Sequence, residues 1–224
     1  MNRLNSRKAA LSSLFAVAIV TVLPSTSHAQ DSRFYIGGSI GRSQVKIDTG
    51  ALADETTAAG LSNTGYSANN SDTGWKLFAG YKFHPNFAVE GGYVDLGKFS
   101  ASTIITAVNG TPIVPTSLTF SIEATEGFFV SGLGIWPVNN QFSMFGKVGG
   151  YNMKTEATAS VLGINISDNA RNNGWLFGLG GQFDFTKNVG LRLEWERFNK
   201  VGDKDKTAQG DIDLLSLGLV YRFQ

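Results

Sequence analysis

The chain has 224 residues, no cysteine, and 19 Lys and Arg against 18 Asp and Glu. This balance excludes a strongly basic nucleic-acid-binding protein as the default interpretation, and the lack of cysteine excludes a fold held by disulfides. Glycine and phenylalanine are frequent, with 27 and 16 residues, and there are only 5 prolines. Together with the lack of helix-period stripes, this composition favours strands and turns.

The first 29 residues have the layout of a secretory signal peptide. Arg3, Arg7 and Lys8 precede an apolar stretch at 9–23, and the small-residue pattern Ser27-His28-Ala29 precedes a predicted cleavage point after Ala29. A transmembrane helix needs about 20 apolar residues, which this stretch does not reach. Cleavage removes three basic residues and no acidic one, leaving 16 Lys and Arg against 18 Asp and Glu in residues 30–224. We expect those residues to form one domain.

Alternation of apolar and polar residues predicts eight strands in the rest of the chain. Their ranges are 33–47, 73–83, 87–99, 118–136, 141–153, 173–185, 188–199 and 211–223. The connections at 48–72, 100–117 and 154–172 are long, those at 84–86, 137–140 and 186–187 are short, and 200–210 is intermediate. No apolar run is long enough for a membrane helix. The pattern predicts an all-β fold, an eight-stranded antiparallel transmembrane β-barrel in an up-and-down meander, with long extracellular loops and short periplasmic turns.

The parity of each strand predicts which side chains face lipid. In 73–83, 87–99, 173–185 and 188–199, large apolar residues share one parity, so the charged residues of the other parity must point inward. These inward charged residues are Lys76, Lys82, Glu90, Asp184, Arg192, Glu194 and Glu196. In 118–136 the run Phe128-Phe129-Val130 interrupts the alternation and leaves the faces open. A bulge at this run would reconcile the two halves of the strand.

Outward aromatic residues are predicted at two levels. Trp75 and Trp175 lie toward the extracellular side, and a larger set lies at the periplasmic rim: Tyr81, Phe83, Phe87, Trp136, Phe183, Phe185, Tyr221 and Phe223. Two aromatic girdles are typical of a barrel that crosses a hydrocarbon layer. Inward glycines such as Gly178 and Gly180 are expected to make room for bulky neighbours in the lumen.

Three segments resemble the transmembrane domain of the OmpA family: residues 89–97, 192–195 and 214–223, with a weaker likeness at 147–150. The resemblance implies an outer-membrane barrel that is exported through the general secretory route. It also implies that the chain end, with Tyr221 and Phe223, serves as an insertion signal. The family's barrel commonly precedes a peptidoglycan-binding domain, and since this sequence stops at Gln224, cell-wall anchoring is not implied.

The family resemblance also implies a lumen crossed by ion pairs. Glu90, Lys147, Arg192 and Glu194 match the family's inward charged positions, and the strand parity adds Lys82 and Asp184 to the predicted lumen charge network. Gly132 stands where the family has a lysine on its fourth strand, and Gln182 or Asp184 stands where it has a glutamate on its sixth. These departures favour a static, mutually satisfied network over a switchable gate. An eight-stranded barrel is only wide enough for its own side chains.

An enzyme is the competing class of protein. Barrel proteases and lipases use histidine with Ser or Asp, but His28 leaves with the signal peptide and His84 falls in a predicted periplasmic turn. No catalytic residue, metal site or cofactor is therefore expected.

The predicted role is structural or surface-contact and adhesin-like, and the alternative is a narrow porin or small-solute channel. Loops 48–72 and 100–117 are the places where partner-specific function would lie. Expected partners are outer-membrane lipid and lipopolysaccharide, the barrel-assembly machinery with periplasmic chaperones, and host or surface ligands bound by the loops. No nucleic acid is expected as a partner, and the barrel is predicted to be a monomer.

Overall fold

The structure, a computed structural model, describes residues 33–45, 57–58, 60–161, 164–203 and 208–223. The predicted signal peptide, residues 1–29, lies outside these residues. No helix in the described part of the chain is both long and apolar enough to span a membrane. The described residues form ten strands: β1 (Phe34–Val45), β2 (Leu61–Asn69), β3 (Ser71–His84), β4 (Phe87–Asp95), β5 (Phe99–Val108), β6 (Thr111–Pro137), β7 (Phe142–Val161), β8 (Ile164–Asp184), β9 (Val189–Asp203) and β10 (Ala208–Arg222).

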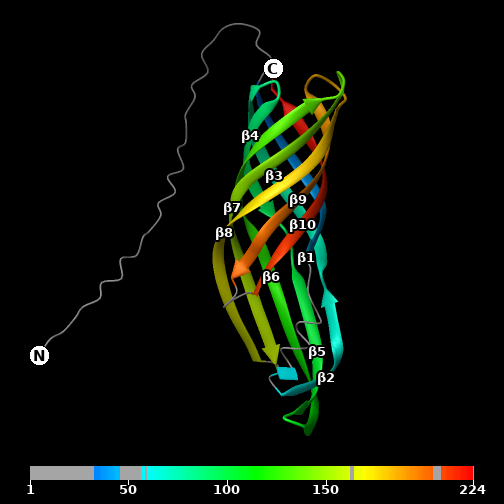
Figure 1. The fold of residues 1–224 in the computed structure, drawn as a ribbon, viewed down its shortest axis with the longest axis vertical. Coiled ribbons are helices and arrows are strands. Elements are labelled where there is room, and N and C mark those ends of the chain that lie inside the picture. Colours follow the sequence, from blue (N-terminus) through cyan, green and yellow to red (C-terminus); the bar gives the residue numbers. More distant parts are fainter. Residues whose placement is uncertain (1–32, 46–56, 59, 162–163, 204–207, 224) are drawn as a thin grey trace, which may run out of the picture.

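Eight of these strands close into a ring of antiparallel pairs. Their order is β6-β4-β3-β1-β10-β9-β8-β7, and β7 pairs again with β6. The first strand, β1, pairs with the last strand, β10, so that Ile36 lies opposite Tyr221 and Ile40 opposite Leu217. The tilted strands wrap around one long axis, and the C-terminal end of β10 lies at the end with the tight turns (Figure 1). The predicted eight-stranded up-and-down barrel is confirmed.

Two further strands correct the prediction that 48–72 and 100–117 are loops. β5 forms a hairpin with the first half of β6, and β2 pairs with the other edge of β5. The hairpin turns at Asn109 and Gly110, whose φ angles are 49° and 77°. Positive φ at both central residues is the geometry for which an Asn-Gly pair is preferred in two-residue hairpins. This pair, flanked by β-branched residues, was the signal for the missed hairpin.

Three barrel strands are much longer than a bilayer requires. β6, β7 and β8 have 27, 20 and 21 residues, whereas a spanning strand needs about 9–11. The predicted loop 154–172 is therefore mostly strand, since β7 continues to Val161 and β8 begins at Ile164. The distal parts of β6, β7 and β8 join β2 and β5 in an extension beyond the barrel, which we call the extracellular head (Figure 1).

The inside and outside faces follow the predicted parity. In β3, Trp75, Leu77 and Ala79 are exposed while Lys76 and Phe78 are buried, and β4, β8, β9 and β10 alternate in the same sense. In β6, Phe128 and Val130 point out, both 67% exposed, and Phe129 points in, 2% exposed. The predicted bulge at 128–130 is wrong, because the β6–β7 register is regular there and shifts between Ile122 and Ala124.

Outward aromatic rings gather in pairs at two levels. One level has Trp75 against Tyr93 and Trp175 against Phe177. The other level has the pairs Phe34–Tyr81, Phe83–Phe87, Phe183–Phe185 and Tyr221–Phe223. These two levels correspond to the predicted girdles.

An inward glycine makes room for a lumen ring, as expected. A Cβ at Gly180 would lie 2.3 Å from Cζ of Phe145. Any larger residue at this position would have to displace the ring.

Candidate functional site

Six charged side chains meet inside the barrel at mid-height. Lys76 comes from β3, Glu90 from β4, Lys147 from β7, and Arg192, Glu194 and Glu196 come from β9. All are inward by strand parity, and none is more than 6% exposed. We call these six residues the charge cluster.

The ion pairs of the charge cluster link every member to at least one opposite charge. Nζ of Lys76 lies 2.5 Å from Glu194 and also contacts Glu196. Nζ of Lys147 lies 2.6 Å from Glu194, contacts Glu196, and lies 4.0 Å from Oε2 of Glu90. A guanidinium nitrogen of Arg192 lies 2.5 Å from Oε1 of Glu90. Three cations therefore face three carboxylates, as burial of charge requires.

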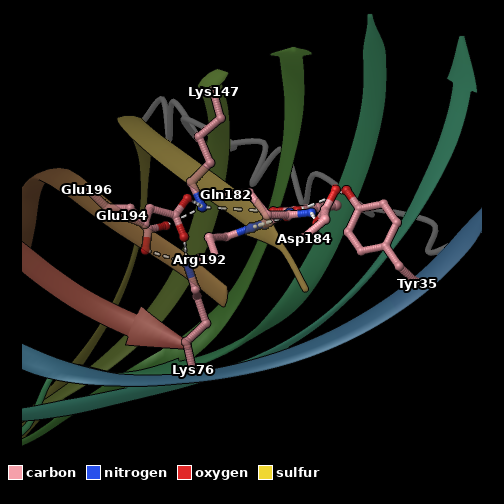
Figure 2. Close-up of polar contacts among 9 residues, drawn as sticks. Tyr35, Lys76, Lys147, Gln182, Asp184, Arg192, Glu194 and Glu196 are labelled. Atoms are coloured by element: carbon pink, nitrogen blue, oxygen red, sulfur yellow. Dashed lines mark hydrogen bonds and ion pairs between the residues drawn. The ribbon is translucent and has the colours of Figure 1, made fainter. Parts of the chain in front are cut away.

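The two lysines approach the glutamates from opposite sides, as Figure 2 shows. Lys76 and Lys147 therefore bridge the same two carboxylates, Glu194 and Glu196. This shared coordination ties β3 and β7 to β9 across the lumen.

Neutral groups continue the network toward the periplasmic end. The hydroxyl of Tyr35 donates to Glu90 at 2.9 Å, and Nε and one terminal nitrogen of Arg192 donate to Oε1 of Gln182 at 3.1 and 3.0 Å. Gln182 then donates to Asp184, which also pairs with Arg222. Gln182, one of the two residues predicted to replace the family's glutamate, thus supplies an amide that orients Arg192 (Figure 2).

Aromatic rings enclose the cations of the charge cluster. The Arg192 guanidinium lies 4.7 Å from the ring centroid of Phe145 and 4.9 Å from that of Phe78. Nζ of Lys147 lies 5.2 Å from the ring of Phe129. Such contacts favour a desolvated cation by roughly 2 kcal/mol, and they exclude water from the ion pairs.

On the extracellular side of the charge cluster, the lumen is filled by apolar side chains. The members are 0–2% exposed and come from β4, β5, β7, β8, β9, β10 and the segment after β4: Val94, Leu96, Phe99, Met153, Leu176, Phe198 and Leu214. We call this set the apolar plug. The apolar plug was missed from sequence. Strand parity identifies charged residues that cannot face lipid, whereas an apolar residue can face either the lipid or a packed lumen.

A small cavity lies at the periplasmic end. It has a volume of about 100 Å³, and residues at the periplasmic ends of seven barrel strands line it, among them Tyr35, Lys82, Ser143, Gln182, Asp184, Arg192 and Arg222. Lys82 therefore lies beside this cavity and not in the charge cluster. Of the six residues predicted for the lumen network, Glu90, Lys147, Arg192 and Glu194 meet in the cluster, and Asp184 is connected to it through Gln182.

Two inward residues belong to the cluster although the family resemblance did not select them. Lys76 and Glu196 are both 0% exposed and pair with each other. Gly132, taken as the site of the family's fourth-strand lysine, faces outward in β6. No residue at that position would reach the lumen, and Lys76 and Lys147 supply the lysines instead.

His84 has a structural contact at the end of its strand, and the described residues contain no cluster suited to a metal ion. His84 lies at the end of β3, where its Nδ1 accepts a hydrogen bond from the backbone N–H of Asn86. No group of three or more His, Cys, Asp or Glu side chains in the described ranges could hold a metal ion.

A closed ring of eight antiparallel strands, with a charged lumen and an apolar outer band between two aromatic girdles, defines an integral outer-membrane β-barrel. The family model for the OmpA-like transmembrane domain matches residues 29–224. The chain therefore belongs to the OmpA-like transmembrane domain family, and its location is the cell outer membrane.

Curated relatives and solved structures are similar to this chain to different extents. Outer membrane protein A of Klebsiella aerogenes is 28% identical over 195 residues, which cover 87% of this chain and 49% of that protein. The chain thus spans about half the length of the curated relatives it matches. Ail of Yersinia pestis matches 87% of this chain and 100% of its own, at 19% identity and a TM-score of 0.46. The N-terminal barrel domain of OprF from Pseudomonas aeruginosa matches 87% of this chain and 100% of its own, at 10% identity and a TM-score of 0.48.

Proposed function

We propose that this protein is a sealed barrel with a structural and surface-contact role, and not a channel. The single observation that carries the proposal is the apolar plug. Seven side chains with almost no solvent exposure fill the lumen directly beyond the charge cluster. A hydrated ion or sugar would have to open this packing, and each displaced Leu or Phe would lose the free energy of its burial.

Swelling of proteoliposomes in small sugars tests this role. Vesicles that contain the refolded protein should swell no faster than empty vesicles. An open porin in the same lipid is the positive control. Swelling that rises with the amount of protein would overturn the sealed-barrel proposal and favour the channel.

The surface-contact part of the role rests on the extracellular head. No charged residue occurs between Phe99 and Ile122, which includes all of β5 and the distal part of β6. Ile104, Val108, Ile113 and Val114 are 37–83% exposed around the hairpin turn. An uncharged surface with exposed aliphatic side chains is suited to contact with another surface. A variant with residues 103–116 replaced by a short turn should lose binding to host or bacterial surfaces while the barrel still assembles.

A narrow channel remains the second candidate, and one observation favours it. Glu90 contacts Arg192 at 2.5 Å and has Lys147 at 4.0 Å, so the same carboxylate has two cations within reach. Exchange between the two cations would rearrange the charge cluster. This exchange alone would not open the lumen, since the apolar plug lies beyond it.

The remaining expectations concern assembly and chemistry. We propose that Tyr221 and Phe223, whose rings form an edge-to-face pair at the end of β10, act as the insertion signal read by the barrel-assembly machinery after delivery by periplasmic chaperones. The expected partners in the membrane are lipid and lipopolysaccharide, and the expected state is a monomer. The proposed role is not enzymatic.

A further inference from the structure

The extracellular girdle contains two groups of packed aromatic rings. The first ring group consists of Trp75, Tyr93 and Phe128 on β3, β4 and β6, and the second ring group consists of Trp175, Phe177 and Trp195 on β8 and β9. Neighbouring rings within each group have centroids 5.2–5.7 Å apart. All of these side chains point outward by strand parity, so the rings alone do not distinguish the two sides of the barrel.

The first ring group borders carboxylates on its extracellular side. Asp95 follows Tyr93 by two residues on β4, and it lies opposite Glu126 of β6. The hydroxyl of Tyr93 donates a hydrogen bond to Glu126 at 2.6 Å. An anionic lipid headgroup at this place would therefore meet two carboxylates that carry its own sign of charge.

The second ring group borders guanidinium groups on its extracellular side. Arg197 of β9 lies 5.5 Å from the ring centroid of Trp195, and Asp213 accepts hydrogen bonds from only two of its nitrogens, both at 2.6 Å. Arg171 of β8 is exposed, four residues from Trp175 and on the same parity. The guanidinium of Arg171 forms no hydrogen bond or ion pair with the described residues. Arg171 is therefore available to an anion outside the protein.

Neighbouring side chains do not neutralise Arg171. Lys154 of β7 lies directly opposite Arg171 in the strand register and forms an ion pair with Glu156. Asp168, the nearest acidic residue of β8, lies on the other parity, and its carboxylate accepts the backbone N–H of Asn169 at 2.7 Å. On the outward face of the described parts of β7 and β8, two cations therefore accompany one carboxylate.

The height of the two guanidinium groups matches the headgroup layer of the outer leaflet. Tryptophan rings mark the boundary between hydrocarbon and headgroups. Arg197 is two residues beyond Trp195 and Arg171 is four beyond Trp175. These separations correspond to about 7 and 13 Å along a strand, and to less along the membrane normal because barrel strands are tilted. Both side chains can therefore reach headgroup phosphates.

Lipopolysaccharide carries phosphates on sugar rings at this level. Guanidinium groups offer parallel N–H donors that match phosphate oxygens, and indole rings present an apolar face to the adjoining lipid. We propose that the outer face of β8 and β9 binds a headgroup phosphate of lipopolysaccharide, held by Arg171 and Arg197 above the second ring group. This inference rests on the proposed membrane partnership with lipopolysaccharide and places that partner on one side of the barrel.

The indole N–H signals of the four tryptophans test the site in one experiment. When short-chain lipopolysaccharide is added to the refolded full chain in neutral detergent, the signals of Trp175 and Trp195 should shift saturably. Trp75, in the first ring group, should shift much less, and Trp136, near the periplasmic end of β6, should not shift. Lipopolysaccharide stripped of its phosphates, or phosphatidylglycerol at the same phosphate concentration, should not reproduce these shifts.

Substitution of the two arginines tests their role as ligands. Arg171→Gln/Arg197→Gln should weaken binding at least about tenfold, which corresponds to 1.4 kcal/mol. The charge-matched control Arg33→Gln/Lys187→Gln removes two exposed cations at the periplasmic end and should bind as the parent does. If the double variant does not fold, Arg171→Gln alone, which breaks no hydrogen bond or ion pair with the described residues, should still weaken binding.

The outcomes separate the site from the partnership on which it rests. Equal shifts of Trp75 and Trp175 would keep lipopolysaccharide as a partner but overturn the site on β8 and β9. Unchanged affinity of the arginine variants, or the same shifts with phosphatidylglycerol, would also overturn this site. Absence of any shift with lipopolysaccharide would contradict the partnership itself, while vesicle swelling tests the sealed lumen independently.

Discussion

The periplasmic and extracellular halves of the lumen are filled in different ways. The periplasmic half and the middle contain the small periplasmic cavity and the charge cluster, whereas the extracellular half contains the apolar plug. Charges inside a barrel must be neutralised by partners at fixed positions, so one missing partner leaves a buried charge. Apolar residues need only volume and shape. The comparison indicates that the cluster specifies which strands meet, while the plug contributes stabilisation and closes the lumen.

Removal of one member of the charge cluster is expected to have the largest effect. Arg192→Gln leaves the buried Glu90 carboxylate with Lys147, at 4.0 Å, as its remaining ion-pair partner, and its expected cost is about 3–5 kcal/mol in the free energy of unfolding. Urea unfolding in detergent measures this cost. Glu90→Gln should cost a similar amount, and the double variant should cost less than the sum of the two.

The matched control for this cycle is an ion pair on the outer face. Arg197 and Asp213 form a bidentate pair whose side chains are 27% and 25% exposed. Arg197→Gln should cost no more than about 1 kcal/mol, as exposed pairs do. Strictly additive effects of Glu90→Gln and Arg192→Gln would mean that the two residues are not partners.

Truncation within the apolar plug should have the next largest effect. Leu176→Ala leaves a cavity among fully buried side chains and should cost about 2–5 kcal/mol. Leu179, three residues further along β8, is 62% exposed on the lipid face, so Leu179→Ala opens no internal cavity and should cost less. Urea unfolding of the two variants side by side measures the difference, and equal costs would contradict the assignment of Leu176 to a packed plug.

A substitution in the hairpin turn separates the extracellular head from the barrel. Gly110 has a φ of 77°, and a side chain in this conformation costs about 1–2 kcal/mol. Gly110→Val should therefore increase hydrogen exchange in β5 and the distal part of β6. The barrel strands β1 and β10 should keep their protection. Loss of protection throughout the barrel would show that the head and the barrel fold as one unit.

The smallest effect on stability is expected at the chain end. Phe223→Asp places a charge at the periplasmic interface, which costs up to roughly 1 kcal/mol at that depth. If Phe223 is part of the insertion signal, the level of protein in the outer membrane should fall by more than this destabilisation explains. Immunoblots of outer-membrane fractions measure the level, with Phe185→Asp at the same rim as the control. Normal levels of Phe223→Asp would place the signal elsewhere.

The sequence predicted the barrel and its faces because lipid imposes a simple rule on each strand. Lys76, Glu90 and Arg192 each stand between outward apolar neighbours, and parity assigns them to the lumen without further information. The head was not predicted, since neither β2 nor β5 shows a sustained alternation of apolar and polar residues, and most residues of β5 are only partly buried. The Asn109-Gly110 pair was the local signal that could have revealed the hairpin.

The composition of the site was harder to predict than its position. Which inward charges meet depends on strand stagger, and this stagger places Lys82 by the cavity while Lys76 and Lys147 converge on Glu194 and Glu196. The apolar plug depends on the same stagger, because its members, such as Leu176 and Leu214, come from different strands and belong to one buried cluster. Strand parity predicts whether a side chain faces the lumen or the lipid. The register between neighbouring strands of the closed ring determines which lumen side chains contact each other.

Single-channel recording in planar bilayers tests the sealed lumen most directly. The refolded protein should give no sustained openings, while a variant with the plug reduced, Leu176→Gly/Phe198→Ala/Leu214→Ala, should conduct if it remains folded. Heat-dependent migration on gels verifies that the variant is folded. Sustained openings of the unmodified protein, with the same conductance in the plug variant, would contradict the conclusion that the apolar plug closes this barrel.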